Sequence, residues 1–149
     1  MRKVLITTPT FAKYDATPVE YLTGHGFDVV RLSAYPADPA EIRVKIADVV
    51  GVVVGLERID ADMIGSAPCL RIISKHGIGV DNIDVDAARR SGVMVANAPH
   101  ESARTVAELS LLLLMACARK ILVADAAVRQ GKWGPIFGTE VKGKTLGVV

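Results

Sequence analysis

Residues 76–84 read His-Gly-Ile-Gly-Val-Asp-Asn-Ile-Asp, and Lys75 separates them from the apolar run 71–74. Two glycines one residue apart let the backbone turn tightly and expose successive amide N–H groups, which suits a carboxylate or phosphate oxygen. In an open α/β sheet, ligands bind outside the carboxyl ends of the strands. A bare Gly-X-Gly also fits a strand-to-helix turn with no binding role. The added polar residues Asp81, Asn82 and Asp84 favour a binding turn.

Short runs rich in valine and isoleucine recur before and after this turn, and we expect them to be strands buried on both faces. They lie at 4–7, 27–32, 49–54, 71–74 and 93–96. Stretches with helical spacing lie between them, at 18–23, 39–47, 61–64 and 85–91. The alternation of strand and helix predicts an α/β fold, a parallel sheet covered on both sides.

Glycines and one aspartate mark the ends of these helices. Gly24 and Gly26 follow the first helix and Gly92 follows the fourth, where a left-handed residue commonly ends a helix. Asp84 is placed to cap the start of the fourth helix. The turn 97–100, Asn-Ala-Pro-His, is the best candidate for a domain boundary.

A different pattern begins after this turn. Ser102 is placed to cap one helix that we expect to continue to about Gln130, a length of ~42 Å. Apolar residues cover nearly its whole circumference, so we expect burial by a sheet and by a second subunit. A polar loop at 130–143 leads to Lys-Thr-Leu-Gly-Val-Val at 144–149, which predicts the start of a strand.

Composition and charge exclude several classes of protein. The 18 basic and 16 acidic residues are spread along the chain, with a net charge of +2. Without a polybasic block, neither nucleic acid nor an anionic membrane surface is an expected partner. The apolar segment 109–118 would span ~15 Å as a helix against ~30 Å of hydrocarbon, and the apolar N-terminal stretch is too short for a signal peptide.

The two cysteines, Cys69 and Cys117, form no Cys-X-X-Cys pair and no cluster with histidine. We therefore expect no metal site. Both are expected to be buried, reduced thiols of a cytoplasmic protein.

The glycine turn is part of a longer series of motifs. HGIGVDNID at 76–84 is followed by AARRSGVMVANAP at 87–99, TVAEL at 105–109, GKW at 131–133 and GKTLGVV at 143–149. In order and spacing this series resembles the D-isomer-specific 2-hydroxyacid dehydrogenase family, most of all its phosphoglycerate dehydrogenase branch. The resemblance covers about 49–149, and the first 48 residues match only in pattern.

The resemblance implies a flavodoxin-like substrate domain at 1–98, followed at 99–149 by the first helix and first strand of an incomplete Rossmann domain for NAD. In the family the Gly-X-Gly-X-X-Gly turn that receives the pyrophosphate comes next, and this chain has no such turn. We therefore expect the N-terminal portion of an NAD-dependent enzyme, inactive alone, that forms a homodimer through the helix at 102–130.

The family's substrate loop corresponds to Lys75, Gly77, Ile78 and Gly79. By resemblance, the backbone amides of Ile78 and Gly79 hold the carboxylate of a small anionic 2-hydroxy or 2-oxo acid. Lys75 lies beside them in sequence and adds positive charge.

The resemblance also suggests where the cofactor lies and which reaction occurs. Thr105 and Val106 correspond to positions near the nicotinamide ring, although Val106 fits a plain core residue equally well. The implied reaction is hydride transfer between C2 of a D-2-hydroxy acid and C4 of the nicotinamide. The family's catalytic arginine, glutamate and histidine lie beyond residue 149, so no catalytic residue is expected in this chain.

One departure from the family concerns substrate choice. Several phosphoglycerate dehydrogenases have an arginine and a serine at the end of the third strand, where this chain has Val54 and Gly55. Arg58 is a possible substitute from the next turn. A 3-phosphoglycerate-like acid, glyoxylate and hydroxypyruvate all remain candidate substrates.

The three histidines are not assigned a catalytic role. His25 is expected in solvent at a helix end, and His100 in the turn between the domains. His76 adjoins the substrate loop, where a histidine satisfied at a strand end is commoner than one that touches a ligand.

Two other classes of protein share this kind of fold. One is a nucleotide-sensing, corepressor-like binding module without enzymatic activity, which NADH-dependent turnover would exclude. The other is a receiver-type signalling domain, which needs an acidic pair after the first strand. The chain has Thr7, Thr8 and Pro9 there, so we discount the receiver.

Overall fold

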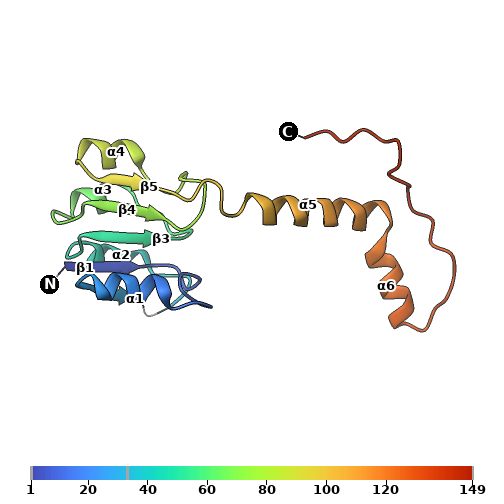
Figure 1. The fold of residues 1–149 in the computed structure, drawn as a ribbon, viewed down its shortest axis with the longest axis horizontal. Coiled ribbons are helices and arrows are strands. Elements are labelled where there is room, and N and C mark those ends of the chain that lie inside the picture. Colours follow the sequence, from blue (N-terminus) through green and yellow to red (C-terminus); the bar gives the residue numbers. More distant parts are fainter. Residues whose placement is uncertain (1, 33, 149) are drawn as a thin grey trace. The chain divides into compact units, whose positions relative to one another are not determined.

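The computed structural model describes residues 2–32 and 34–148 and divides the chain into two compact units, Met1–Ser102 and Ala103–Val149 (Figure 1). The first unit contains β1 (Arg2–Ile6), α1 (Thr17–Gly24), β2 (Phe27–Arg31), α2 (Pro39–Ile46), β3 (Gly51–Val54), α3 (Ala61–Gly65), β4 (Ile72–Lys75), α4 (Val85–Arg90) and β5 (Met94–Ala96). The second contains α5 (Ala103–Ala118) and α6 (Ile121–Arg129).

The five strands form one parallel sheet in the order β2-β1-β3-β4-β5. This is the flavodoxin-like order, so the predicted fold class of the first unit is confirmed. The chain reverses its direction of winding between β1 and β3. The carboxyl ends of these two strands therefore form the topological switch point, where such sheets bind ligands.

The helix ends follow the sequence signals. The carboxylate of Asp84 accepts a hydrogen bond of 2.8 Å from the amide of Ala87, so the predicted cap of α4 is confirmed. Gly92 has a φ of +68° just beyond α4, and Gly26 has a φ of +77° beyond α1. These positive φ values favour glycine because a side chain is disfavoured there.

The two faces of the sheet are covered unequally. On one face, residues of β1, β3 and β4 join α2, α3 and α4 in the larger core, which includes Leu5, Ile46 and Ile73. On the other face, α1 packs over a small cluster centred on β1. Ile72 and Met94 on that face are 36% and 65% exposed. In the described first unit α1 is the one helix on this face, so the first unit by itself does not cover β4 and β5 there.

The prediction of a single helix at 102–130 is wrong, because the structure has two helices there, α5 and α6. Lys120 between them has a left-handed backbone with a φ of +53°, which ends α5. The carbonyl of Ala118 accepts a 2.7 Å hydrogen bond from the amide of Thr139, a residue of the following loop. This bond satisfies a carbonyl at the end of α5 that a continuing helix would have used.

The strand predicted at 144–149 is also not found, since residues 144–148 have no strand structure and Val149 lies outside the described residues. A parallel strand needs a neighbour with which to exchange hydrogen bonds, and the second unit contains no other strand among its described residues.

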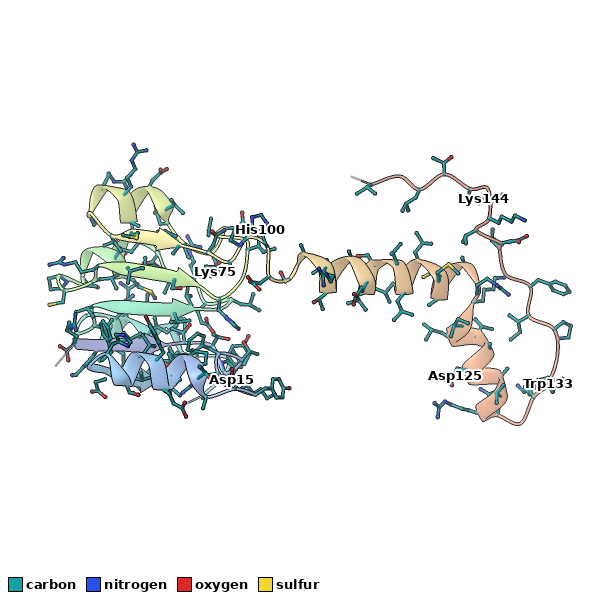
Figure 2. The ribbon with its side chains drawn as sticks, viewed as in Figure 1. Asp15, Lys75, His100, Asp125, Trp133 and Lys144 are labelled. Atoms are coloured by element: carbon teal, nitrogen blue, oxygen red, sulfur yellow. The ribbon has the colours of Figure 1, made fainter. Side chains whose placement is uncertain are left out.

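The apolar side chains of the second unit are exposed within that unit. The burial expected for them requires a sheet and a second subunit, which this unit does not itself contain. Leu112 is 64% exposed and Leu122 80%, and Figure 2 shows side chains extending from α5 in several directions. Cys117 on α5 is exposed, as is Cys69 in the turn before β4. Both cysteines are free, so the predicted reduced state agrees with the structure but the predicted burial does not.

Within the described residues, no helix has the length and apolar character needed to cross a membrane. The same residues contain no cluster of histidine, cysteine, aspartate and glutamate that could hold a metal ion.

Candidate functional site

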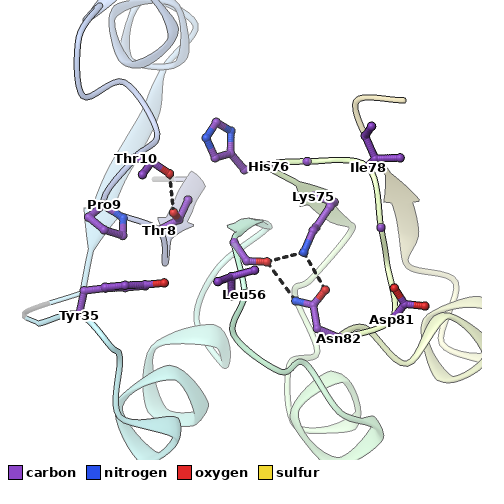
Figure 3. A pocket seen from close by; sticks show the side chains of 13 residues that line it. Thr8, Pro9, Thr10, Tyr35, Leu56, Lys75, His76, Ile78, Asp81 and Asn82 are labelled. Carbon is purple, nitrogen blue, oxygen red and sulfur yellow. Dashed lines mark hydrogen bonds between the residues drawn. The ribbon is translucent and has the colours of Figure 1, made fainter. Parts of the chain in front are cut away.

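A cleft of about 710 Å³ lies at the carboxyl ends of β1, β3 and β4, at the switch point of the sheet (Figure 3). Its lining comes from the loops that follow these strands and from the segment after β2. The residues are Thr8, Pro9, Thr10, Tyr35, Gly55, Leu56, Lys75, His76, Gly77, Ile78, Gly79, Asp81 and Asn82. All four residues predicted to bind substrate are among them.

The loop after β4 is held through its carbonyl groups, while the amides of its glycine turn have no acceptor among the described residues. The carbonyl of Gly77 accepts a 2.9 Å hydrogen bond from the amide of Ala98, and the carbonyl of Ile78 accepts a 2.8 Å bond from Nδ2 of Asn97. Within the described part of the chain, the amides of Gly77, Ile78 and Gly79 donate to no acceptor. Because these residues line the cleft, their N–H groups can serve an anionic ligand.

Both glycines of this loop meet a local requirement. Gly77 has a φ of +148°, which disfavours any residue with a side chain. A Cβ added at Gly79 would lie 3.1 Å from Oδ2 of Asp81, closer than a comfortable contact. Gly77 is therefore required by its backbone conformation, whereas a side chain at residue 79 would require Asp81 to shift.

Lys75 is buried at the end of β4, with 8% of its surface exposed. Its ammonium donates to the carbonyl of Gly55 at 2.5 Å and to Oδ1 of Asn82 at 2.7 Å. Asn82 in turn donates from Nδ2 to the carbonyls of Gly55 and Glu57, at 3.1 and 2.6 Å. This network ties the loop after β3 to the loop after β4, and it leaves one lysine N–H for a ligand.

The role of Asn82 as the partner of Lys75 was not predicted. The sequence indicated only that Asn82 extends a binding turn, because the two residues are seven positions apart and meet through the curvature of the loop. The sequence does show a lysine that directly follows an apolar run and an asparagine in the turn after it. That combination could have indicated a hydrogen bond between Lys75 and Asn82.

Gly55 stands where the ends of β1 and β3 approach each other closely. A Cβ at residue 55 would lie 2.7 Å from Cβ of Thr8 and 2.9 Å from its Oγ1. Oε2 of Glu57 accepts hydrogen bonds from the amide of Gly55 at 3.0 Å and from Oγ1 of Thr7 at 2.7 Å. Any residue with a side chain at 55 would force these two loops apart.

The wall opposite the glycine loop is formed by Thr8, Thr10, Tyr35 and Leu56. The hydroxyls of Thr8 and Thr10 share a hydrogen bond of 2.9 Å, and Tyr35 directs its hydroxyl toward the cleft (Figure 3). These residues were not predicted to belong to the site, because they come from loops after three different strands.

The histidines differ in their relation to the cleft. His76 lines it, and its ring packs edge-on against Phe11 with the ring centres 5.7 Å apart. Nδ1 of His25 lies 2.7 Å from the carbonyl of Tyr21 at the end of α1. His100 is exposed and does not line the cleft.

Arg58, the predicted substitute for a missing phosphate ligand, is exposed and lines two neighbouring hollows. It does not line the cleft itself.

The resolved pKa shifts lie away from the cleft. At the amino-terminal edge of the sheet, the hydrogen bond between Lys3 and Asp48, 2.5 Å long, raises the pKa of Lys3 and lowers that of Asp48. Hydrogen bonds from Thr17 lower the pKa of Asp15 before α1.

Thr105 and Val106 lie in the first turn of α5, in the second unit, and both are exposed. Figure 2 shows the side chains of this helix. The chain contains no Gly-X-Gly-X-X-Gly turn, and residues 144–148 form no strand that could present one. The residues of this chain therefore do not by themselves fit a dinucleotide.

Comparison with known proteins identifies the family of this chain. The model of the D-isomer-specific 2-hydroxyacid dehydrogenase catalytic domain matches residues 4–142. A D-3-phosphoglycerate dehydrogenase of Mycobacterium tuberculosis is 46% identical over 93 residues, which are 61% of this chain and 18% of that protein. The chain thus spans less than a fifth of the length of this relative.

Two solved structures resemble the chain over almost its whole length. The NAD+-bound 3-phosphoglycerate dehydrogenase of Entamoeba histolytica has a TM-score of 0.75 and 28% identity, over 95% of this chain and 43% of that one. An NADPH-dependent glyoxylate/hydroxypyruvate reductase of Sinorhizobium meliloti, in complex with NADP and malonate, has a TM-score of 0.75 and 26% identity, over 97% of this chain and 44% of that one. The chain belongs to the D-isomer-specific 2-hydroxyacid dehydrogenase family.

Proposed function

We propose that this chain supplies the acid-binding domain of an NAD-dependent oxidoreductase, which transfers a hydride between the nicotinamide and C2 of a small D-2-hydroxy acid or its 2-oxo counterpart. One observation carries the proposal: the amides of Ile78 and Gly79 are unpaired and line a cleft at the switch point, with Lys75 buried beside them. Family membership supports the class of reaction.

In this proposal the chain's own residues hold and orient the acid. The two amides donate to the carboxylate, and the remaining N–H of Lys75 adds a charged donor. Hydrogen bonds to a charged group contribute about 1.5–3 kcal/mol each when buried. Because the carbonyls of Gly77 and Ile78 are fixed by Ala98 and Asn97, the loop holds its donors in place before the acid arrives.

We further propose that residues 1–98 form the substrate domain and that 99–149 begin the NAD domain of a longer enzyme. The division into two units after Ser102 supports this assignment. Thr105 and Val106 would then lie near the nicotinamide, and the proton transfers would fall to residues outside this chain.

A homodimer through α5 and α6 is part of the same proposal. It is supported by the apolar side chains that these helices expose, including Leu112 and Leu122. A cytoplasmic location is supported by the two free cysteines.

The test uses the protein expressed from its whole coding sequence. NADH oxidation is followed with glyoxylate, hydroxypyruvate and pyruvate, and turnover of at least one of them is expected. Ile78→Pro removes one amide donor without adding charge, so KM for the acid should rise about 10- to 100-fold. Ile78→Leu keeps the donor and is the matched control. Absence of turnover with every acid would refute the proposed function.

A further inference from the structure

The charges lining the cleft are few. Among its described lining residues, Lys75 is the one lysine or arginine and Asp81 the one acid, and these two do not form an ion pair. Two of the three N–H groups of Lys75 are already used by Gly55 and Asn82. The remaining N–H group of Lys75 can donate to one carboxylate.

The wall opposite the glycine loop is neutral. Thr8, Thr10 and Tyr35 offer hydroxyl groups, and Leu56, which is 80% exposed, offers an apolar surface beside them. Hydroxyl groups can donate to or accept from an uncharged polar substituent. They cannot balance the charge of about −1.5 to −2 that a phosphate group carries near neutral pH.

His76 lines the cleft, and its ring packs edge-on against Phe11. Among the described residues, the neighbouring arginines do not line the cleft. Gly55 has no room for a side chain, because a Cβ there would lie 2.7 Å from Thr8. Arg58 lines other hollows. Arg31 lines an adjoining hollow of about 290 Å³, and its guanidinium donates to the carbonyl of Phe11 at 3.2 Å.

We infer that the acid bound by this cleft carries no phosphate at C3: where the acid has a third carbon, its substituent is uncharged, a hydrogen or a hydroxyl. The inference rests on the proposed function: the substrate carboxylate occupies the amides of Ile78 and Gly79 and the free N–H of Lys75. The C3 substituent then faces Thr8, Thr10, Tyr35 and Leu56. A phosphate placed there would lose its hydration without gaining a charged partner.

The experiment compares two substrates that differ only in the phosphate. With the protein expressed from its whole coding sequence and NADH, kcat/KM is measured for hydroxypyruvate and for its 3-phosphate ester. The inference predicts a kcat/KM about tenfold or more higher for hydroxypyruvate. An equal or higher value for the phosphate ester would overturn it. If Arg31→Gln then removed that preference, the adjoining hollow would be the phosphate site.

A pair of variants tests whether the C3 substituent faces the neutral wall. Leu56→Arg places a cation on the neutral wall, at an exposed position, and should raise the relative kcat/KM of the phosphate ester about tenfold. Val44→Arg makes the same kind of change on α2, where Val44 is 75% exposed, and should leave the ratio unchanged. If Leu56→Arg also leaves the ratio unchanged, the substituent does not face this wall and the inference fails. If neither acid, nor glyoxylate or pyruvate, is turned over, the proposed function itself fails.

Discussion

Oδ1 of Asn82 accepts a hydrogen bond of 2.7 Å from the ammonium of Lys75, and both side chains bond to the carbonyl of Gly55. The partners of this buried lysine are thus neutral, and none of the ion pairs found among the described residues includes it. Its positive charge is oriented but not neutralised. A bound carboxylate would be its natural counter-ion.

Replacing this lysine should weaken binding of the acid more than it slows turnover. For Lys75→Met in the protein expressed from its whole coding sequence, we expect KM for the acid to rise about 10- to 100-fold, because one charge-assisted hydrogen bond is lost. The matched control is Lys3→Met at the opposite edge of the sheet, where Lys3 pairs with Asp48. Steady-state kinetics that gave the same KM for Lys75→Met and the unaltered protein would contradict this role.

Because the loops after β1 and β3 lie close together at Gly55, a side chain at this position should lower the free energy of unfolding. Gly55→Ala places a Cβ 2.7 Å from Cβ of Thr8, so we expect a loss of about 1–3 kcal/mol in the free energy of unfolding. Gly65→Ala at the end of α3 is the control, since its Cβ would meet nothing within 4 Å. Urea unfolding of both variants measures the difference. If Gly55→Ala and Gly65→Ala had the same free energy of unfolding, the loops after β1 and β3 would be able to move apart without cost.

Much of the first unit could be predicted because its signals are local. Val-rich runs, Asp84 as a helix cap and the glycines 77 and 79 each report on their immediate neighbours, and the alternation of strand and helix predicts a parallel sheet. The flavodoxin-like strand order was implied by the family resemblance. The neutral wall could not be predicted. Its members Thr8, Tyr35 and Leu56 are far apart in sequence, and only the packing of the sheet brings their loops together.

The second unit was harder to predict for a different reason. The region around Lys120 contains neither glycine nor proline, so nothing in the local sequence indicates a left-handed residue. The carbonyl of Ala118 is instead satisfied by Thr139, a non-local hydrogen bond. Apolar periodicity predicted burial on every side, but burial also needs a partner surface, and the unit alone does not provide one.

The exposed surface of α5 should make the 149-residue chain associate with itself. Leu112 and Leu113 are 64% and 55% exposed. We therefore expect concentration-dependent dimers in sedimentation velocity, and Leu112→Lys should weaken them. Val44→Lys, on an exposed apolar residue of α2, should leave association unchanged. A strictly monomeric chain at all concentrations would refute the proposed dimer helix.

The same chain should bind NAD weakly or not at all. It contains no Gly-X-Gly-X-X-Gly turn, so no row of backbone amides at a helix start is available for the pyrophosphate. Isothermal titration calorimetry of the 149-residue chain with NAD measures this directly. A dissociation constant on the order of micromolar, about −8 kcal/mol, would contradict the expectation.

We expect the amides of Ile78 and Gly79 to receive the carboxylate of the acid. Titration of the ¹⁵N-labelled 149-residue chain with glyoxylate, followed by amide NMR, shows which backbone amides the acid contacts. We predict that the resonances of Ile78 and Gly79 shift together and saturably, and that Lys75→Met weakens the response. If these two resonances stay fixed while amides elsewhere respond, or if no amide responds, the acid does not bind at this loop.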